Sequence, residues 1–277
     1  GSYDVVHAPA LAFPPTRHPL VVTVHGLEWR DPAHGAPARA VKWHEAALAR
    51  AANSDAVLLA STTELAARLR QDGLHRVATL DGALYGCDHL PPPDEEATSQ
   101  LLDRLGVGER YLLSVGTLEP RKNLPRLVEA YGRARDRIDR IPLVLVGPEG
   151  WGPGLAPADG VVLAGPVDDA VLAALYGWAT GVAYVPLHEG YGLPAVEAMR
   201  AGAPVVASPI PSTSDAALVV DPADVGAIAD ALVRVATDGP ERDELVAAGT
   251  AHAAGLTWAA AAVRHAELWS QVHRGTR

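Results

Sequence analysis

The sequence is short of several residue types that particular functions need. Cys87 is the only cysteine in 277 residues, so neither an intrachain disulfide nor a cluster of thiolate metal ligands can form. Lysine occurs only at Lys42 and Lys122, and 33 acidic residues outnumber 23 lysines and arginines, which gives a net charge of −10. Such a charge repels polyanions and argues against nucleic acid as the main partner. No uninterrupted apolar run reaches the roughly 18 residues that a transmembrane helix needs.

The composition provides enough apolar residues for a hydrophobic core. Hydrophobic residues make up 48% of the chain, which excludes global disorder. The length suits one large α/β domain or two modest ones. No secretion signal is recognisable, so we expect a cytoplasmic protein without a transmembrane segment, for which peripheral membrane contact stays open.

Short β-branched runs alternate with helical segments along the chain. This alternation predicts parallel sheets with helices on both faces. In the first part, strands are expected at 3–7, 19–24, 56–60 and 75–79, with helices at 40–52 and at 65–70, the second opened by a capping box at 61–64. In the second part, strands are expected at 111–115, 143–146, 161–163, 182–185, 205–207 and 217–220, with helices at 124–134, 169–178, 195–201, 225–237 and 241–254.

Three prolines and three acids at 91–96 predict an exposed, extended linker between two domains. We therefore expect a small Rossmann-like domain over residues 1–90 and a second one over 91–257. The amphipathic helix predicted within 258–277 is expected to cross back to the first domain. Ligands of such sheets bind beyond the carboxyl ends of the strands, and the cleft between two facing sheets is the expected site.

A glycine turn joins a strand to a helix at residues 184–195. Gly190 and Gly192 let the backbone approach a ligand closely, and Pro194 suits the first turn of the helix that follows. The free N–H groups at the start of that helix favour an anion, of which phosphate is the natural example.

Two acids, Glu189 and Glu197, bracket this anion site. Carboxylates repel phosphate but accept hydrogen bonds from sugar hydroxyls, so a diphosphate flanked by two sugars, a nucleotide sugar, fits the arrangement. An alternative is that Glu197 only favours the positive end of the helix dipole. Gly190, Gly192 and Ala195 also match a dinucleotide fingerprint, but the next strand ends at 208–211 without the acid that this fingerprint needs.

A second loop, at 115–123, also follows a strand and leads into a helix. Arg121 and Lys122 in this loop would neutralise a diphosphate if they reached the cleft; the alternative is a solvated basic turn. Because both loops leave the same edge of one parallel sheet, we expect them to converge.

The segments 116–124 and 188–199 resemble the two donor-site signatures of retaining GT-B glycosyltransferases of family 4, also called group 1. Within the first segment, residues 119–123 resemble the corresponding stretch of many mannosyltransferases. The second segment matches the family's E-x7-E motif, and 165–169 is similar to its base-contacting loop. The resemblance covers most of the chain. It implies an α/β GT-B fold with two facing Rossmann-like, doubly wound domains, of which the N-terminal one is incomplete because similar enzymes carry a longer stretch before Asp4.

The resemblance also implies a role for each candidate residue. Thr117 follows Gly116 where many members have an arginine, so the phosphate clamp is expected to lean on Arg121 as well as Lys122. His25 would face the transferred sugar from the first domain, although a lone histidine is more often structural. The other implied contacts are Glu189 with the sugar, Glu197 with the ribose, the backbone of Gly190, Tyr191, Gly192 and Leu193 with the phosphates, and Val167 and Asp168 with the base.

The activity implied is metal-independent, retaining transfer of a hexose, with mannose favoured, to an unknown acceptor that is a glycan, a lipid-linked sugar or a small molecule. No cofactor is expected, and the donor is a nucleotide diphosphate sugar, with GDP-mannose favoured over UDP-sugars. The sequence has no D-x-D triplet for a metal-dependent site. Two other classes stay open: a donor-binding module without activity, and another GT-B activity such as a sugar-nucleotide epimerase or a phosphorylase.

Overall fold

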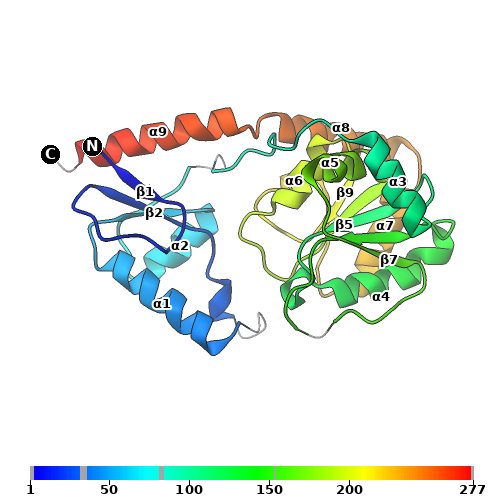
Figure 1. Ribbon diagram of the computed structural model, residues 1–277, viewed down its shortest axis with the longest axis horizontal. Helices are drawn as coiled ribbons and strands as arrows, with labels where there is room; N and C mark the ends of the chain where they lie inside the picture. The colour runs from blue at the N-terminus through cyan, green and yellow to red at the C-terminus, as the bar shows by residue number, and fades with distance from the viewer. Residues whose placement is uncertain (1–2, 32–35, 81–83, 153, 276–277) are drawn as a thin grey trace. The chain divides into compact units, whose positions relative to one another are not determined.

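The computed structural model describes residues 3–31, 36–80, 84–152 and 154–275. The chain divides into two compact units (Figure 1). Unit 1 comprises Gly1–Gly86, Glu189–Tyr191 and Leu256–Arg277, and unit 2 comprises Cys87–His188 and Gly192–Gly255.

Unit 1 is built on a four-stranded parallel sheet in the order β1-β2-β3-β4. Alternate residues of its strands face opposite sides, as the two-residue period of a strand requires. Val22 and Leu58 pack with α1 and α2, whereas Val21 and Leu59 pack with α9. The strands are β1 Val6–Ala8, β2 Leu20–Val24, β3 Val57–Ala60 and β4 Val77–Ala78, and the helices are α1 Ala38–Ala52, α2 Thr63–Gln71 and α9 Trp258–Arg274, with the 3-10 turn η1 Glu28–Arg30.

Unit 2 contains a six-stranded parallel sheet in the order β10-β9-β8-β5-β6-β7. Helices α4 and α7 pack together on one face, and α5 and α6 lie on the other (Figure 1). The strands are β5 Leu112–Val115, β6 Leu143–Val146, β7 Val161–Gly165, β8 Gly181–Tyr184, β9 Val205–Ala207 and β10 Leu218–Val219. The helices are α3 Glu95–Leu105, α4 Leu124–Ala134, α5 Asp169–Trp178, α6 Leu193–Arg200, α7 Val225–Ala236 and α8 Pro240–Ala254, with 3-10 turns η3 Pro120–Lys122, η4 Arg135–Arg137 and η5 Ser214–Ala216.

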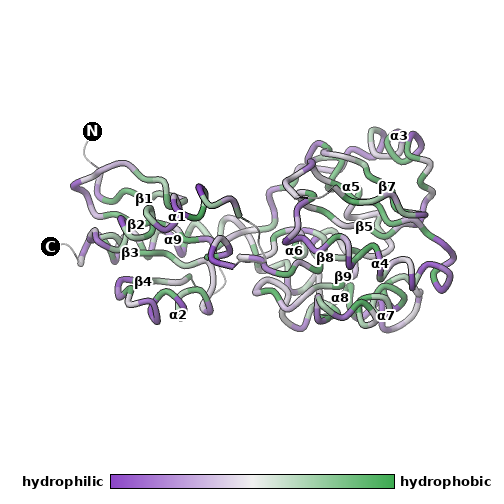
Figure 2. Tube along the Cα trace, turned by 90° about the horizontal axis from the view of Figure 1, so that it is seen from below, coloured by the Kyte–Doolittle hydropathy of each residue, from purple (hydrophilic) through white to green (hydrophobic). Residues whose placement is uncertain are grey.

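Hydropathy follows this architecture. The central strands of both sheets run through hydrophobic segments, and many of the polar segments lie in connections and along parts of the helices (Figure 2). All four residues of β6 and of β8 are buried, as is expected of strands covered by helices on both faces. The predicted α/β class with parallel, Rossmann-like sheets is confirmed.

Two local predictions were wrong. Residues 91–96 are not linker throughout, because the Asp94 carboxylate accepts a hydrogen bond from the Ala97 N–H at 2.9 Å and opens helix α3 at Glu95. The capping box at 61–64 does not form either. Thr62 is the N-cap of α2, accepting from the Leu65 N–H at 3.0 Å, while the Ser61 hydroxyl donates to a backbone carbonyl elsewhere.

In the described part of the chain, no helix taken alone has both the length and the apolar character to cross a bilayer. By length and composition only, the bent pair of α8 and α9 passes that test.

Candidate active site

The direction of the chain across the sheet of unit 2 changes at β5. From β5 the chain continues through β6 and β7 on one side, and then returns to β8, β9 and β10 on the other. β5 and β8 pair directly, with Leu112 opposite Gly181 and Leu113 opposite Val182. Ligands of doubly wound sheets bind at this kind of switch point, beyond the carboxyl ends of the strands. The loops after β5 and β8 leave the sheet there.

These two loops are tied together by hydrogen bonds. The Leu187 N–H donates to the Arg121 carbonyl at 2.8 Å. The buried Asn123 side chain donates to the Val185 carbonyl at 3.1 Å and to the Pro222 carbonyl at 2.7 Å. Asn123 also has φ 60°, a left-handed conformation that asparagine tolerates better than most residues. The expected convergence of the two loops is therefore confirmed.

The loop after β6 contacts the loop after β5; β6 and β8 are the two strands that flank β5 in the sheet. The Leu118 N–H donates to the Pro148 carbonyl at 2.9 Å. Gly147 has φ +143°, and a Cβ there would lie 2.2 Å from the Gly116 carbonyl oxygen. Only glycine fits this close approach of two backbones.

Lys122 lies at the switch point itself. Its Nζ donates to the Tyr184 hydroxyl at 2.6 Å and lies 4.8 Å from the centroid of the same ring. A Cβ at Gly116 would be 3.3 Å from Lys122 Cε, so the lysine side chain runs directly beside the glycine turn. The loop thus places a cation at the carboxyl ends of β5 and β8.

Arg121, the second predicted cation, has an acidic partner. Its guanidinium forms an ion pair with the buried Glu119 carboxylate of the same loop. Thr117 lies beside the loop after β6, because a Cβ on Gly150 would meet the Thr117 methyl at 2.8 Å. Arg121 is therefore paired with a carboxylate of its own loop.

The start of α6 is shaped by Gly192. This residue has φ +100°, and a Cβ there would lie 2.5 Å from Ile210 Cδ1 and 2.7 Å from Ser212 Oγ. Leu193 is the first residue of α6 and Pro194 lies in its first turn, as expected for Pro194. Among the described residues no side chain caps this helix. The first turn therefore presents backbone N–H groups at the positive end of the helix dipole.

Glu197 is buried on α6 with an exposed fraction of 8%. Its Oε2 accepts a hydrogen bond from the Tyr176 hydroxyl at 3.1 Å, and His89 Nε2 lies 3.4 Å from its Oε1. Burial raises the pKa of Glu197, and His89 and Tyr176 act in the opposite direction. Sequence reasoning missed both partners; the only signal for Tyr176 was that a buried phenol needs a hydrogen-bond partner.

The remaining predicted contacts of unit 2 lie on the loop between β7 and α5. Asp168 occupies the N-cap position of α5 without making a side-chain cap. Val167 and Asp168 line a hollow of about 430 Å³, together with α3 residues Ala97, Leu101 and Arg104. The helix that sequence reasoning missed therefore forms one wall of this hollow.

In unit 1, His25 follows β2. Its Nε2 lies 2.6 Å from the Pro9 carbonyl oxygen, and its Nδ1 is hydrogen-bonded to the Tyr85 hydroxyl. Because a carbonyl only accepts, Nε2 carries the proton, and in the neutral ring Nδ1 accepts from Tyr85. Burial is the largest cause of a raised pKa at Tyr85, which keeps its proton available for this bond.

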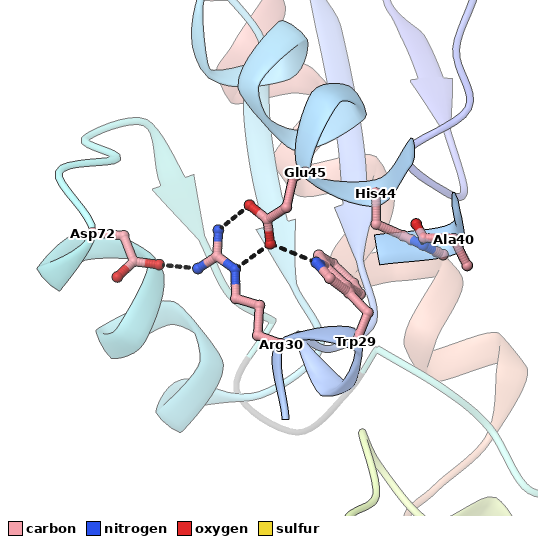
Figure 3. A network of polar contacts seen from close by, with 6 residues as sticks. All are labelled: Trp29, Arg30, Ala40, His44, Glu45 and Asp72. Carbon is pink, nitrogen blue, oxygen red and sulfur yellow. Dashed lines mark hydrogen bonds and ion pairs between the residues drawn. The ribbon is translucent and has the colours of Figure 1, made fainter. Parts of the chain in front are cut away.

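The turn after His25 is held by a polar network that sequence reasoning also missed (Figure 3). Arg30 donates to the Glu45 carboxylate from Nε at 2.6 Å and from Nη2 at 2.8 Å, and it also pairs with Asp72. Trp29 donates to Glu45 Oε1 at 2.7 Å and stacks on the ring of His44. The 3-10 turn η1 is thereby fixed to both α1 and the end of α2.

The predicted E-x7-E motif spans both units. Glu189, Gly190 and Tyr191 group with unit 1, whereas Glu197 belongs to unit 2. The Glu189 carboxylate accepts a hydrogen bond from the Gly190 N–H at 3.3 Å. Unit 2 by itself brings together the loop from Gly116 to Asn123, the start of α6 and Glu197.

Solved structures with the same architecture define the class of protein. The fold is similar to sucrose-phosphate synthase from Thermosynechococcus elongatus, with a TM-score of 0.74 and 20% identity over 99% of this chain and 74% of that one. It is also similar to a UDP-forming α,α-trehalose-phosphate synthase from Burkholderia xenovorans, with a TM-score of 0.69 and 17% identity over 92% of this chain and 68% of that one. The fold is that of the GT-B class.

Sequence comparison narrows this class to a family. Residues 109–238 match the model described as glycosyl transferases group 1. The chain is 30% identical over 271 residues to O-antigen chain mannosyltransferase B of Escherichia coli, covering 92% of this chain and 71% of the relative. It is 32% identical over 179 residues to the serotype-specific mannosyltransferase WbdA of Escherichia coli, covering 59% of this chain and 22% of that longer protein. The chain belongs to the group 1 glycosyltransferases, and it is a glycosyltransferase.

Proposed function

We propose that this glycosyltransferase moves a hexose, with mannose first among the candidates, from a nucleotide diphosphate sugar to an acceptor hydroxyl, with retention of the anomeric configuration. The observation that carries the proposal is the position of Lys122 Nζ at the β5–β8 switch point, bonded to Tyr184 at 2.6 Å, in the loop tied to the one that leads into α6. A cation and helix N–H groups suit a diphosphate, and the buried Glu197 suits ribose hydroxyls.

Mannose is favoured because relatives matching this chain at 30% and 32% identity are named mannosyltransferases. GDP-mannose is accordingly the first donor to test, before UDP-sugars. Val167 and Asp168, which line the hollow beside α3, are the proposed contacts of the base. The acceptor is a glycan, a lipid-linked sugar or a small molecule.

The proposed reaction is a front-face substitution. The acceptor oxygen bonds to the anomeric carbon as the bond from that carbon to the β-phosphate oxygen breaks, and the acceptor proton passes to the leaving phosphate. Lys122 and the N-terminus of α6 stabilise the negative charge that develops on the diphosphate, and Arg121 contributes when its pairing with Glu119 is shared with a phosphate. No metal ion is invoked in this proposal.

In the same proposal the backbone from Gly116 to Thr117 and from Gly190 through Tyr191 and Gly192 to Leu193 meets the phosphates. Glu189 and His25 face the transferred sugar. The His25 ring presents a fixed tautomer, because its Nε2 is committed to the Pro9 carbonyl at 2.6 Å. The proposal for His25 is accordingly a positioning contact rather than a general base.

The test measures release of GDP from GDP-mannose, and of UDP from UDP-glucose, with and without candidate acceptors. Lys122→Ala is expected to lower turnover by at least about 100-fold, since it removes the charge that offsets the leaving diphosphate. Lys42→Ala is the matched control, because it removes the only other lysine, on the exposed side of α1. Equal turnover in both variants would contradict the assignment, and donor binding without turnover in the wild type would indicate a binding module instead.

A further inference from the structure

Two tyrosines that the sequence motifs do not single out hold the two charged side chains of the candidate site. Tyr176 on α5 is 0% exposed, and its hydroxyl donates to Glu197 Oε2 at 3.1 Å. Tyr184, the last residue of β8, is 3% exposed, and its hydroxyl accepts from Lys122 Nζ at 2.6 Å. Both phenols therefore use their polar atom on a charged group, inside a region where an unpaired hydroxyl is costly.

The two pairs are neighbours within unit 2. Burial is the main reason that the pKa of Tyr176 lies well above its usual value, Glu197 adds to the shift, and Tyr184 adds a further contribution. On the far side of Glu197, His89 Nε2 lies 3.4 Å from Oε1. The carboxylate is thus contacted on both oxygens, one by a buried phenol and one by an imidazole.

These contacts orient the charged groups and leave them able to bind a ligand. A carboxylate offers about four acceptor positions, so one contact on each oxygen leaves positions for two vicinal hydroxyls. A phenol oxygen likewise accepts a hydrogen bond from an ammonium and orients it, as the Tyr184 hydroxyl does for Lys122 Nζ. The contact with Tyr184 therefore fixes the position of the Lys122 ammonium.

We propose that Tyr176 and Tyr184 are positioning residues: Tyr176 aligns Glu197 with the ribose hydroxyls of the donor, and Tyr184 aligns Lys122 with its diphosphate. The proposal rests on the proposed function, because it takes the donor to be a nucleotide diphosphate sugar. Each tyrosine acts through a different charged group, so each governs recognition of a different part of the ligand.

Because the two tyrosines act on different parts of the ligand, probes that lack one part or the other distinguish their roles. The probes are GDP, 2′,3′-dideoxy-GDP, which lacks the ribose hydroxyls, and GMP, which lacks the β-phosphate; if the wild type binds UDP more tightly, the uridine counterparts replace them. Dissociation constants are measured by calorimetry for the wild type, Tyr176→Phe and Tyr184→Phe. Phenylalanine keeps the buried ring and removes only the hydroxyl, and circular dichroism and thermal unfolding establish that each variant is folded.

Tyr176→Phe is expected to reduce the preference for GDP over dideoxy-GDP by about 5- to 30-fold, with a much smaller change in the preference for GDP over GMP. Tyr184→Phe is expected to reduce the preference for GDP over GMP by a similar factor, with a much smaller change in the preference for GDP over dideoxy-GDP. A purely structural role would move both preferences together in each variant, or neither, and either result would overturn the inference.

The wild type separates failure of this inference from failure of the proposed function. If wild-type protein binds GDP or UDP no more tightly than the dideoxy and monophosphate probes, the donor assignment itself fails. If the wild type discriminates and both phenylalanine variants discriminate equally well, only the positioning role fails.

Discussion

Glu197 accepts a hydrogen bond from the Tyr176 hydroxyl at 3.1 Å while lying almost completely buried in unit 2. A carboxylate in such surroundings is destabilised in its charged form, which is why its pKa is raised. The pair is therefore consistent with the binding role proposed for Glu197, and the burial of this carboxylate comes at some cost in stability.

The first prediction concerns this cost. Because the pKa of Glu197 is higher in the folded than in the unfolded chain, the folded state binds its proton more tightly, and stability falls as pH rises from the ordinary glutamate value through the raised one. Glu197→Gln, which keeps an oxygen to accept from Tyr176, is expected to raise the thermal midpoint at pH 7.

The same substitution is expected to weaken binding of GDP by at least about 10-fold, since a charged acceptor is lost. Thermal unfolding and calorimetry on one preparation measure both effects. A variant that is less stable and binds GDP normally would show that Glu197 is structural.

The second prediction concerns Gly147. Alanine there is expected to destabilise unit 2 by about 2–4 kcal/mol or to displace the Gly116 loop, because the new Cβ would lie 2.2 Å from the Gly116 carbonyl at φ +143°. Denaturant unfolding measures the first effect and GDP affinity the second.

Gly132→Ala is the matched control for Gly147→Ala. Gly132 lies within α4 with no atom within 4 Å of a Cβ, so alanine there is expected to stabilise the protein by up to about 1 kcal/mol. If the two variants had equal stability in denaturant and equal affinity for GDP, the contact between the Gly147 and Gly116 backbones would not constrain the loop.

The third prediction concerns Asn123, which joins the two converging loops. Asn123→Ala is expected to cost about 2–3 kcal/mol, because it removes the bonds to the Val185 and Pro222 carbonyls and places alanine at φ 60°. Asn123→Gly keeps the backbone conformation accessible, so the difference between the two variants isolates the backbone contribution. If alanine and glycine are equally and negligibly destabilising in urea unfolding, the bonds do not hold the loops.

The fourth prediction concerns the network in Figure 3. Hydrogen bonds from Arg30 are the main reason that the pKa of Glu45 is lowered in the folded chain. A lowered pKa means that this stabilisation is present above the ordinary glutamate value, about 4.3, and is lost as pH falls through the lower folded value.

Glu45→Gln is therefore expected to lower the thermal midpoint at pH 7, and the gap to the wild type is expected to narrow in acid. Glu64→Gln, at an exposed position in the first turn of α2, is the control and should change the midpoint little. A gap between Glu45→Gln and the wild type that stays constant from pH 7 to about pH 3 would argue against the ion pair.

Much of the fold was readable from local sequence because strand and helix periods are local properties. The predicted helices at 124–134 and 169–178 coincide with α4 and α5, and the predicted strand at 143–146 coincides with β6. Helix α3 was missed because its cap, Asp94, stands among prolines and acids that are typical of a linker.

The sequence by itself determined that two glycine-containing loops leave one edge of a parallel sheet, with Lys122 in one and Glu197 following the other. Only the tertiary structure decided what holds these charges. Tyr176 is 21 residues from Glu197 in sequence, and Tyr184 is 62 residues from Lys122. No local period links such positions, since they meet only when α5, α6 and the ends of β5 and β8 pack together, and it is that packing which excludes water and gives each hydroxyl its partner.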